Sequence, residues 1–439
     1  MRGMVALFVL GCSMMAAQQA PIPAATELSG QPFAIKKTWV IGGTGDWDYL
    51  TLDPGARRLF IAHGPAVQVV DVDTGAVAGT VKGFREAHAI ALDDAGEFGY
   101  ATDGPAGMVR IFDRRTFEVV GNVSVGGFPR ALTIEPQTGL LFVVVNGQAS
   151  TTPQPPPNNA GRPKNAGGQP PSPPQDAPCG FDRDSNQRPV ARAESLLSVI
   201  DMQKRTEVAQ IRLCGVLGSV QPDATGGVFI NLTSLNDTAR VDAASILQQA
   251  QSSGGSPGGL VDLDWRNNAA PSRPSARNGY RGRSGSASGL RVLWLGPDCK
   301  APRGIAVNGT EHRLFAACSN MKMVVLNTDT GEVVTTLTIG PGADAIAYDA
   351  NSGLIFTANG GGYGSVTVVQ EHVTDSFAVV QNLPTLQQAR TMAVDPSTGL
   401  LYLVTTLYGA RLDHPPANGI GTLKMNPVDG SFQVLVIGR

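Results

Sequence analysis

Six charged or ionisable side chains recur at equivalent places in this chain, each directly before a short apolar segment. They are Asp48, His88, Arg130, Arg303, Asp344 and Arg390. Half of them are arginines, whose planar guanidinium groups form paired hydrogen bonds with carboxylate, phosphate and other anionic groups. The aspartates and the histidine could hold a cation or orient a ligand. If the fold brings these residues together, they predict a binding site for a small anionic ligand or a protein partner.

The apolar segments behind these residues belong to a repeat. Each segment closes on an acidic or amide residue and is followed by a turn and a second apolar segment. The closing residues are Asp53, Asp93, Glu135, Asp223 (in a degenerate copy), Asn308, Asp349 and Asp395. Several of them lie about 40 residues apart, the period of four-stranded propeller blades. The sequence therefore predicts an all-β, seven-bladed propeller. The residues before its inner strands would form a charged ring, the mouth ring, at one end of the central channel.

The two ends of the chain are out of phase with this repeat. The segment Phe33–Ile41 precedes the first inner strand, whereas the unit that begins at Thr391 supplies only three strands. We expect the N-terminal strand to complete the C-terminal blade, because this closes the ring with backbone hydrogen bonds and removes two open sheet edges. A single propeller is thus expected over residues 31–439.

Two insertions interrupt the repeat. The first, at about 149–193 in blade three, is rich in Pro, Gln, Asn and Gly. The second, at about 249–289 in blade four, is rich in Gly, Ser and Arg. Neither composition can build a core, so we expect both insertions to be disordered. The strand order places the first insertion on the face of the channel mouth, together with the long loop 408–430, and the second on the opposite face.

The first residues resemble a targeting signal. Arg2 precedes an apolar run, Met4–Met15, that is too short to span a bilayer, and small residues follow it. Residues 1–17 are therefore predicted to be a signal peptide. The alternative is a lipid anchor on Cys12, which follows Val9-Leu10-Gly11. In both cases we expect a periplasmic or secreted protein, monomeric and without a transmembrane segment.

Four cysteines follow the predicted signal peptide, and an oxidising compartment favours disulfides over metal or redox chemistry. Cys299 precedes the inner strand of blade five and Cys318 ends the second strand of the same blade, so a bridge between them is expected. Cys214 ends the outer strand of blade three, and Cys179 lies in the insertion of that blade. We predict that these two cysteines form the second disulfide.

Several functions lack the residues that they require. The 34 Lys and Arg nearly balance the 36 Asp and Glu, so no global field attracts nucleic acid or an anionic membrane. The histidines have no metal-binding spacing, and no Gly-x-Ser-x-Gly or Cys-x-x-Cys-His motif occurs. We therefore predict no catalytic residue, no metal and no cofactor.

Several short motifs resemble those of a known family. Pro129-Arg130, Pro302-Arg303 and Ala389-Arg390, with the segment Val69–Gly75, are similar to YVTN-type propeller repeats. The chain after the signal peptide resembles the YncE-like extracytoplasmic seven-bladed propellers. The resemblance implies a periplasmic or secreted protein with no settled catalytic role. Some members of the family are linked to single-stranded DNA binding, but the mixed charge and few aromatics of the mouth ring do not support that function here.

Three functions remain in competition. We favour an exported, non-catalytic binding or scaffold propeller with its ligand at the mouth ring. The alternative is a lactonase-type hydrolase, in which Asp48, Asp344 and channel asparagines would hold a divalent metal. Against it, arginines lie between the acidic positions of the ring and would repel a cation. The third hypothesis is an accessory protein of a periplasmic oxidoreductase, whose cofactor would belong to the partner.

Overall fold

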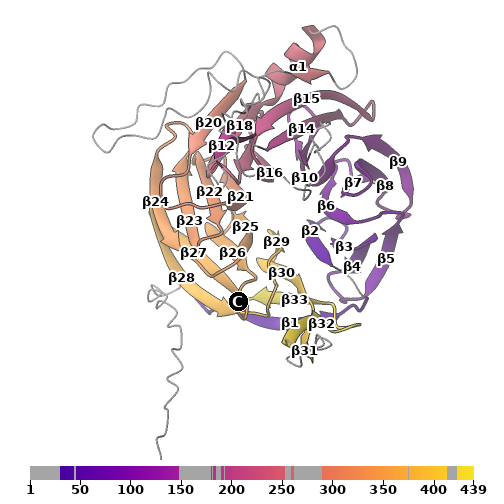
Figure 1. Cartoon of the computed structure of the whole chain (residues 1–439). Helices are drawn as coiled ribbons and strands as arrows, with labels where there is room; N and C mark the ends of the chain where they lie inside the picture. The colour runs from indigo at the N-terminus through magenta and orange to yellow at the C-terminus, as the bar shows by residue number, and fades with distance from the viewer. Residues whose placement is uncertain are drawn as a thin grey trace, which may run out of the picture.

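The computed structural model describes residues 30–43, 46–147, 179, 181–183, 189–191, 193–252, 259–261, 289–373, 375–412 and 423–439. Their strands form seven antiparallel blades around a central channel (Figure 1). Six blades have four strands, and blade three gains a fifth, parallel strand. The prediction of an all-β, seven-bladed propeller is confirmed. The predicted signal peptide and Cys12 lie outside the described residues.

Each blade runs from an inner strand at the channel to an outer strand at the rim. The inner strands, blade by blade, are β2 (Trp47–Asp53), β6 (Ala87–Leu92), β10 (Phe128–Glu135), β16 (Leu217–Pro222), β21 (Pro302–Asn308), β25 (Ala343–Asp349) and β29 (Met392–Asp395). The second strands are β3 (Arg58–His63), β7 (Phe98–Asp103), β11 (Leu140–Asn146), β17 (Gly227–Leu232), β22 (Arg313–Cys318), β26 (Leu354–Asn359) and β30 (Leu400–Thr405). The third strands are β4 (Ala66–Asp71), β8 (Met108–Asp113), β14 (Glu194–Asp201), β18 (Asp237–Asp242), β23 (Lys322–Asn327), β27 (Ser365–Val373) and β33 (Gln433–Gly438). The outer strands are β5 (Val77–Lys82), β9 (Val119–Ser124), β15 (Thr206–Cys214), β20 (Leu290–Trp294), β24 (Val333–Thr338), β28 (Ser376–Pro384) and β1 (Ala34–Val40).

The hydrophobic core lies between neighbouring blades. The second and third strands are apolar on both faces because each blade is covered on both sides, and β11 is a nearly continuous run of buried Leu, Phe and Val. Aromatic rings cross the gaps between blades. Phe60 of blade one and Phe112 of blade two have their ring centroids 5.8 Å apart. Burial of such rings holds each blade against the next.

The ring closes through the two ends of the chain. Strand β1 pairs antiparallel with β33, from Ala34 opposite Gly438 to Val40 opposite Gln433. Trp39 of β1 stacks on the buried ring of Tyr402, with centroids 5.9 Å apart. The N-terminal strand is therefore the outer strand of the C-terminal blade, as the sequence predicts.

The two predicted disulfides are present. Cys179 is bonded to Cys214, and Cys299 is bonded to Cys318, with a Cα–Cα distance of 5.4 Å in both. Each bridge lies just before an inner strand, that of blade four for Cys214 and that of blade five for Cys299.

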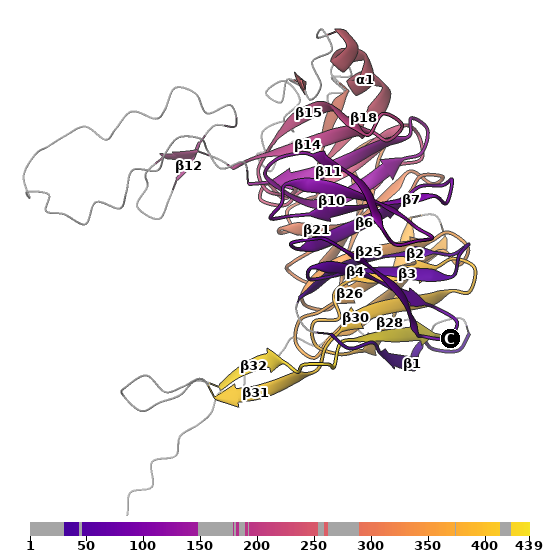
Figure 2. The ribbon, with the colours of Figure 1, turned by 90° about the vertical axis from the view of Figure 1, so that its right-hand side faces the viewer.

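Two hairpins leave the propeller on one side (Figure 2). One is formed by β12 (Phe181–Arg183) and β13 (Pro189–Ala191) in the first insertion. The other is formed by β31 (Tyr408–Leu412) and β32 (Leu423–Pro427). Both hairpins lie between the second and third strands of their blades, so they extend from the face where the inner strands begin. We call this the mouth face.

The second insertion begins earlier than its composition indicates. Helix α1 (Ala243–Ser252) directly follows β18, and β19 (Leu260–Val261) pairs parallel with β15 of blade three. Asp242 caps the helix by accepting a hydrogen bond from the backbone N–H of Ser245 at 2.8 Å, and Ile246 is fully buried. The insertion was predicted to be disordered from about residue 249, but helix α1 continues to Ser252. Residues 253–258 and 262–288 lie outside the described part. No helix in the described residues has the length and apolarity to cross a membrane.

Candidate functional site

Irregularities in the inner strands position the mouth ring. In six blades the pairing of the inner strand with the second strand shifts register near the start of the inner strand. The shifts lie between Trp47 and Leu50, Ala87 and Ile90, Pro129 and Ala131, Leu217 and Val220, Pro302 and Gly304, and Ala343 and Ala345. Such a bulge leaves a residue out of the ladder and redirects its side chain. The sequence placed the ring residues before the strands, but five of them lie inside these bulges, and only Arg390 precedes its strand, β29.

Asp48 and His88 form a buried pair. His88 Nδ1 lies 2.9 Å from Asp48 Oδ2, and the two residues are 3% and 9% exposed. The imidazole also packs against Phe128, with ring centroids 5.1 Å apart. Because His88 is enclosed, it serves as an internal partner of Asp48 and does not offer a ligand a free nitrogen at the mouth.

Asp344 and Arg390 form a second pair. Arg390 Nε lies 3.3 Å from Asp344 Oδ2, and Arg390 Nη1 donates to Gln388 Oε1 at 3.0 Å. Burial raises the pKa of Asp344, and the negative charge of Asp48 raises it further, while the neighbouring arginines oppose both effects. Because the charges of Asp48 and of the three ring arginines all act on the Asp344 carboxyl, these residues form one electrostatic site.

Tyr49 lies beneath this site and was not predicted from the sequence. Its hydroxyl is 3.3 Å from Ser219 Oγ, across the channel from blade one to blade four. Burial raises the pKa of Tyr49, and the nearby Asp344 and Asp48 add to the effect. The phenol therefore stays neutral and can only donate or accept hydrogen bonds. Tyr49 and Ser219 are the first residues of their repeat segments, but only the closed ring brings them together.

A cavity of about 180 Å³ opens in the ring at blade four. The residue at this ring position is Gly218, and a Cβ there would lie 2.8 Å from Thr233 Oγ1 and 3.1 Å from the Arg303 carbonyl oxygen. Glycine is required by this close approach. The charged residues that line the cavity are Asp48, Arg130, Arg303 and Asp344. We call the opening formed by Arg130, Gly218 and Arg303 the blade-four notch.

The two arginines of the notch are the least neutralised cations of the ring. The Arg303 guanidinium makes no ion pair with any residue that the structure describes, and Arg303 is exposed. The Arg130 side chain is 50% exposed, and its nearest carboxylate oxygen, on Asp48, is 3.7 Å away. That oxygen is already bonded to His88. Arg130 and Arg303 can therefore present their N–H groups to an anion in the cavity, whereas Arg390 is engaged with Asp344.

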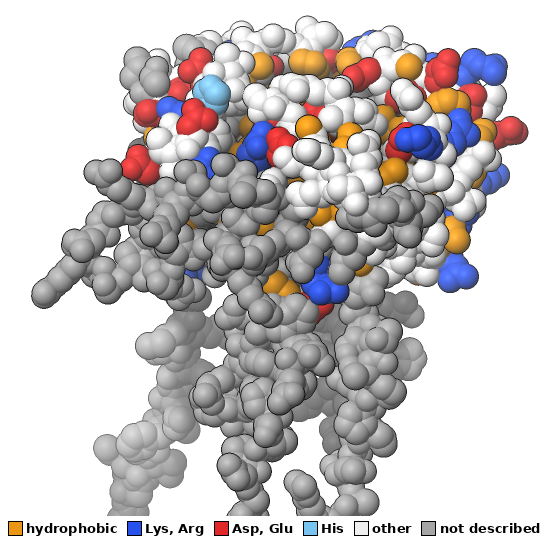
Figure 3. Space-filling model, turned by 90° about the horizontal axis from the view of Figure 1, so that it is seen from above, with side chains coloured by type: hydrophobic (Ala, Val, Ile, Leu, Met, Phe, Trp, Pro, Cys, Tyr) orange, Lys and Arg blue, Asp and Glu red, His pale blue; other side chains and the backbone are white. Residues whose placement is uncertain are grey.

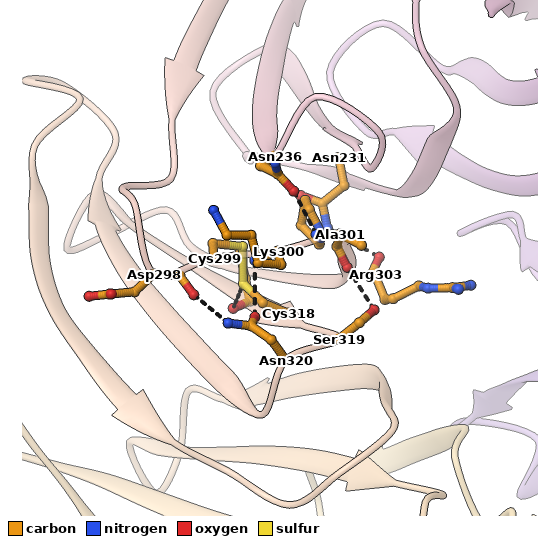
Figure 4. Close-up of a disulfide and its surroundings, with 12 residues drawn as sticks. Asn231, Asn236, Asp298, Cys299, Lys300, Ala301, Arg303, Cys318, Ser319 and Asn320 are labelled. Atoms are coloured by element: carbon orange, nitrogen blue, oxygen red, sulfur yellow. Dashed lines mark hydrogen bonds between the residues drawn. A yellow bond between two sulfur atoms is a disulfide. The ribbon is translucent and has the colours of Figure 1, made fainter. Parts of the chain in front are cut away.

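The backbone of Arg303 is held in place (Figure 4). The Cys299–Cys318 disulfide ties the loop before it to the second strand of its blade. Ala301 N donates to Asn236 Oδ1 at 2.7 Å, and Asn231 Nδ2 donates to the Arg303 carbonyl at 3.1 Å. Figure 4 shows the Arg303 side chain extending away from the disulfide. The backbone of Arg303 is thus fixed, while its guanidinium group makes no ion pair with a described residue.

The other side of the notch is built in the same way. Asn146 binds Leu217 twice, with its Nδ2 donating to the Leu217 carbonyl and its Oδ1 accepting from the Leu217 N–H, both at 2.9 Å. The Cys179–Cys214 disulfide lies just before this segment. The lactonase hypothesis used channel asparagines as metal ligands. The structure uses Asn146 and Asn231 as backbone clamps that shape the notch.

This arrangement suits an anion better than a cation. Each ring carboxylate has a cationic or imidazole side chain as its nearest charged neighbour. Among the residues that the structure describes, no three His, Cys, Asp or Glu side chains gather in a group that could hold a metal ion. The residue set proposed for a lactonase metal, Asp48 and Asp344, is therefore brought into one site but is already paired.

Comparison with known proteins gives structural likenesses only. No protein-family model and no curated protein matches the sequence. A crystal structure of RRP9 WD40 repeats has a TM-score of 0.57 and 9% identity, and covers 96% of this chain and 99% of that one. A structure of U3-55K has a TM-score of 0.56 and 9% identity, covering 90% and 97%. A chain of the mitotic checkpoint complex has a TM-score of 0.54 and 12% identity, covering 89% and 95%. The protein thus shares the fold of the WD40-repeat β-propellers.

Proposed function

We propose that this protein is an exported, non-catalytic binding or scaffold propeller that holds an anionic ligand in the blade-four notch. One observation carries the proposal. Arg130 and Arg303 flank a cavity at the single ring position without a side chain. Arg303 has no ion pair with a described residue, and the nearest carboxylate oxygen to Arg130, on Asp48, is 3.7 Å away and already bonded to His88. The resemblance to YVTN-type, YncE-like propellers and the two disulfides support export, since disulfides persist in oxidising compartments.

The physical basis is charge-assisted hydrogen bonding. Two guanidinium groups on opposite sides of a cavity can bind a carboxylate or phosphate through short N–H···O bonds, each stronger than a neutral bond. Because the backbone of Arg303 is fixed by a disulfide and by Asn231 and Asn236, little ordering of the site would accompany binding. The two aspartates offset most of the charge of the three ring arginines. The remaining positive charge lies at the notch, where Arg303 has no ion pair with a described residue.

The first test is native mass spectrometry of the protein purified from the cells or medium that produce it, with metal analysis on the same sample. We expect a bound anionic molecule and no stoichiometric metal. A stoichiometric divalent metal would favour the lactonase hypothesis, with Asp48 and Asp344 as ligands. The mass of the protein in the same spectra also reports its N-terminal residue. We expect cleavage after Ala17 and not a lipidated Cys12 at the N-terminus.

The second test removes the arginines. The variant Arg130→Ala/Arg303→Ala/Arg390→Ala should lose the copurifying anion. Arg115→Ala is the matched control, because Arg115 is an exposed arginine at a turn on the opposite face. If the triple variant retains its ligand as well as the control does, the site assignment is wrong.

A further inference from the structure

Exposed apolar side chains gather on the mouth face. Its loops and strand ends carry Val40, Val216, Met321, Tyr363, Leu407, Met425 and Val428. The other exposed large apolar side chains lie on outer strands at the rim, at Ile35, Val77, Val120 and Val333. Single exposed apolar residues are normal on a protein surface. Here most of the large ones share the face that carries the notch.

Tyr363 stands out among them. Its side chain is 94% exposed, at the tip of the loop between β26 and β27. The loop itself is fixed, because Gly360 N donates to the Gly342 carbonyl and Gly361 N donates to the Pro341 carbonyl, both at 2.9 Å. A fixed backbone that presents a fully solvated aromatic ring is an arrangement that favours binding, since little backbone entropy is lost when the ring is covered.

The base of this loop touches the mouth ring. A Cβ at Gly360 would lie 2.7 Å from the Cβ of Arg390, and Gln388 N donates to the Gly360 carbonyl at 2.8 Å. Arg390 in turn pairs with Asp344, which lines the notch cavity. The base of the loop that carries Tyr363 is therefore connected to the notch through Arg390 and Asp344, on the same face of the propeller.

We propose that the mouth face docks a protein partner through an acidic, extended peptide segment. A carboxylate of this segment lies between Arg130 and Arg303, and an apolar side chain of the segment packs against Tyr363. This inference rests on the proposed anion site and names its occupant. The charge of the notch is complementary to an acidic residue, and the exposed tyrosine is complementary to an apolar one.

Other features of the described surface agree with a protein partner. The β31–β32 hairpin extends from the same side of the propeller and adds the exposed Met425 (Figure 2). Nucleic acid would require a continuous basic groove with stacking aromatics. The mouth instead includes Asp48 and the half-exposed Glu86. On the described part of the rim seen in Figure 3, acidic and basic side chains are interspersed.

The test is selection of a random twelve-residue peptide library against the full protein, with the Arg130→Ala/Arg303→Ala variant as the subtractive target. We expect enriched peptides that combine Asp or Glu with an aromatic or large aliphatic residue. In fluorescence polarisation, Arg303→Ala should weaken a selected peptide by about tenfold or more, and Tyr363→Ser by about fivefold. Val77→Ser, which removes an exposed apolar side chain from the rim, is the matched control.

The outcomes separate this inference from the proposed function. Loss of binding in both Arg303→Ala and Tyr363→Ser, but not in the control, supports the docking surface. Acidic peptides that depend on Arg303 but not on Tyr363 would leave the anion site standing and overturn the docking surface. If no peptide is enriched, the docking surface is wrong, and calorimetry with citrate and inorganic phosphate then tests the anion site alone.

Discussion

At the scale of single residues, the mouth ring is a set of unequal charges. His88 is hydrogen-bonded to Asp48, Arg390 is paired with Asp344, and the remaining two arginines lie beside Gly218. The residue types and their equivalent positions were predictable, because they recur with the strand period. Their pairing was not, because it depends on where each bulge directs a side chain. The sequence therefore predicted three equivalent arginines, whereas the structure separates Arg390 from the other two.

Asp344 supplies a prediction about pH. Its pKa is raised by burial and by Asp48, so the carboxyl gains a proton at a pH above the ordinary carboxylate range. The ring then becomes more positive, and anion affinity should rise as the pH falls through this pKa. Asp344→Asn should bind the anion about three- to tenfold more tightly at neutral pH. Its affinity should also lose most of this pH dependence in a calorimetric titration series.

The same residue affects stability with a defined sign. Because the folded-state pKa is raised, the stability linked to protonation of Asp344 is present below the ordinary carboxyl pKa and is lost as the pH rises through the folded-state value. Asp344→Asn should therefore gain stability over the wild type at neutral pH and lose this advantage in acid. Asp94→Asn, at an exposed turn of the opposite face, is the control. Equal pH profiles for all three proteins would contradict the assignment.

At the scale of elements, the bulged inner strands and the loops that enter them decide the geometry of the site. The Cys299–Cys318 pair was predictable from the blade register, because Cys299 precedes the inner strand of blade five and Cys318 ends the neighbouring second strand. Helix α1 was not predicted. The insertion was judged by its overall composition, in which the Gly, Ser and Arg residues after the helix dominate. Its own sequence carries a helical pattern, with Ile246, Leu247 and Ala250 on one face, next to the core of blades three and four. Tertiary packing thus orders a segment whose neighbours suggest disorder.

The Cys299–Cys318 bridge gives a prediction at this scale. Cys299→Ser/Cys318→Ser should lower the free energy of unfolding by about 3 kcal/mol, because the bridge closes a short loop in the unfolded chain. It should also weaken anion binding, since the segment that carries Arg303 loses its covalent attachment to β22. Denaturant titration measures the first effect, and calorimetry on the folded variant measures the second. Unchanged affinity in a folded variant would show that the hydrogen bonds from Asn231 and Asn236 position Arg303 without the disulfide.

At the scale of the whole molecule, the propeller is held together by its closure. Blade seven takes three strands from the end of the chain and one, β1, from its beginning. This arrangement was predictable from the repeat alone, because one extra strand precedes the first inner strand and the last repeat lacks its outer strand. The approximate 40-residue period and the apolar runs likewise sufficed for the seven blades. The partners across the channel, such as Tyr49 and Ser219, follow only from the closed ring.

Deletion of residues 34–40 tests the closure. The loss of β1 removes a full row of backbone pairs and the stacking of Trp39 on Tyr402, and it exposes the edge of β33. We expect a large drop in the thermal unfolding temperature and aggregation at protein concentrations that the full chain tolerates. Lys36→Ser/Lys37→Ser, which changes only exposed side chains of the strand, should behave like the wild type. A deletion variant as stable as this control would contradict a structural role for β1.

The closure also determines when the protein can first bind. Ala34 pairs with Gly438, so the contacts that close the ring join residues that are far apart in the sequence, and such distant contacts form slowly. The mouth ring spans the same junction, because Thr391 Oγ1 donates to the Asp48 carbonyl at 2.9 Å and Arg390 Nη2 reaches the Trp47 carbonyl at 3.4 Å. During synthesis, a chain that still lacks its final strand has no complete ring. Ligand binding would then be a property acquired only by finished copies, and recognition at the mouth would distinguish them from incomplete ones.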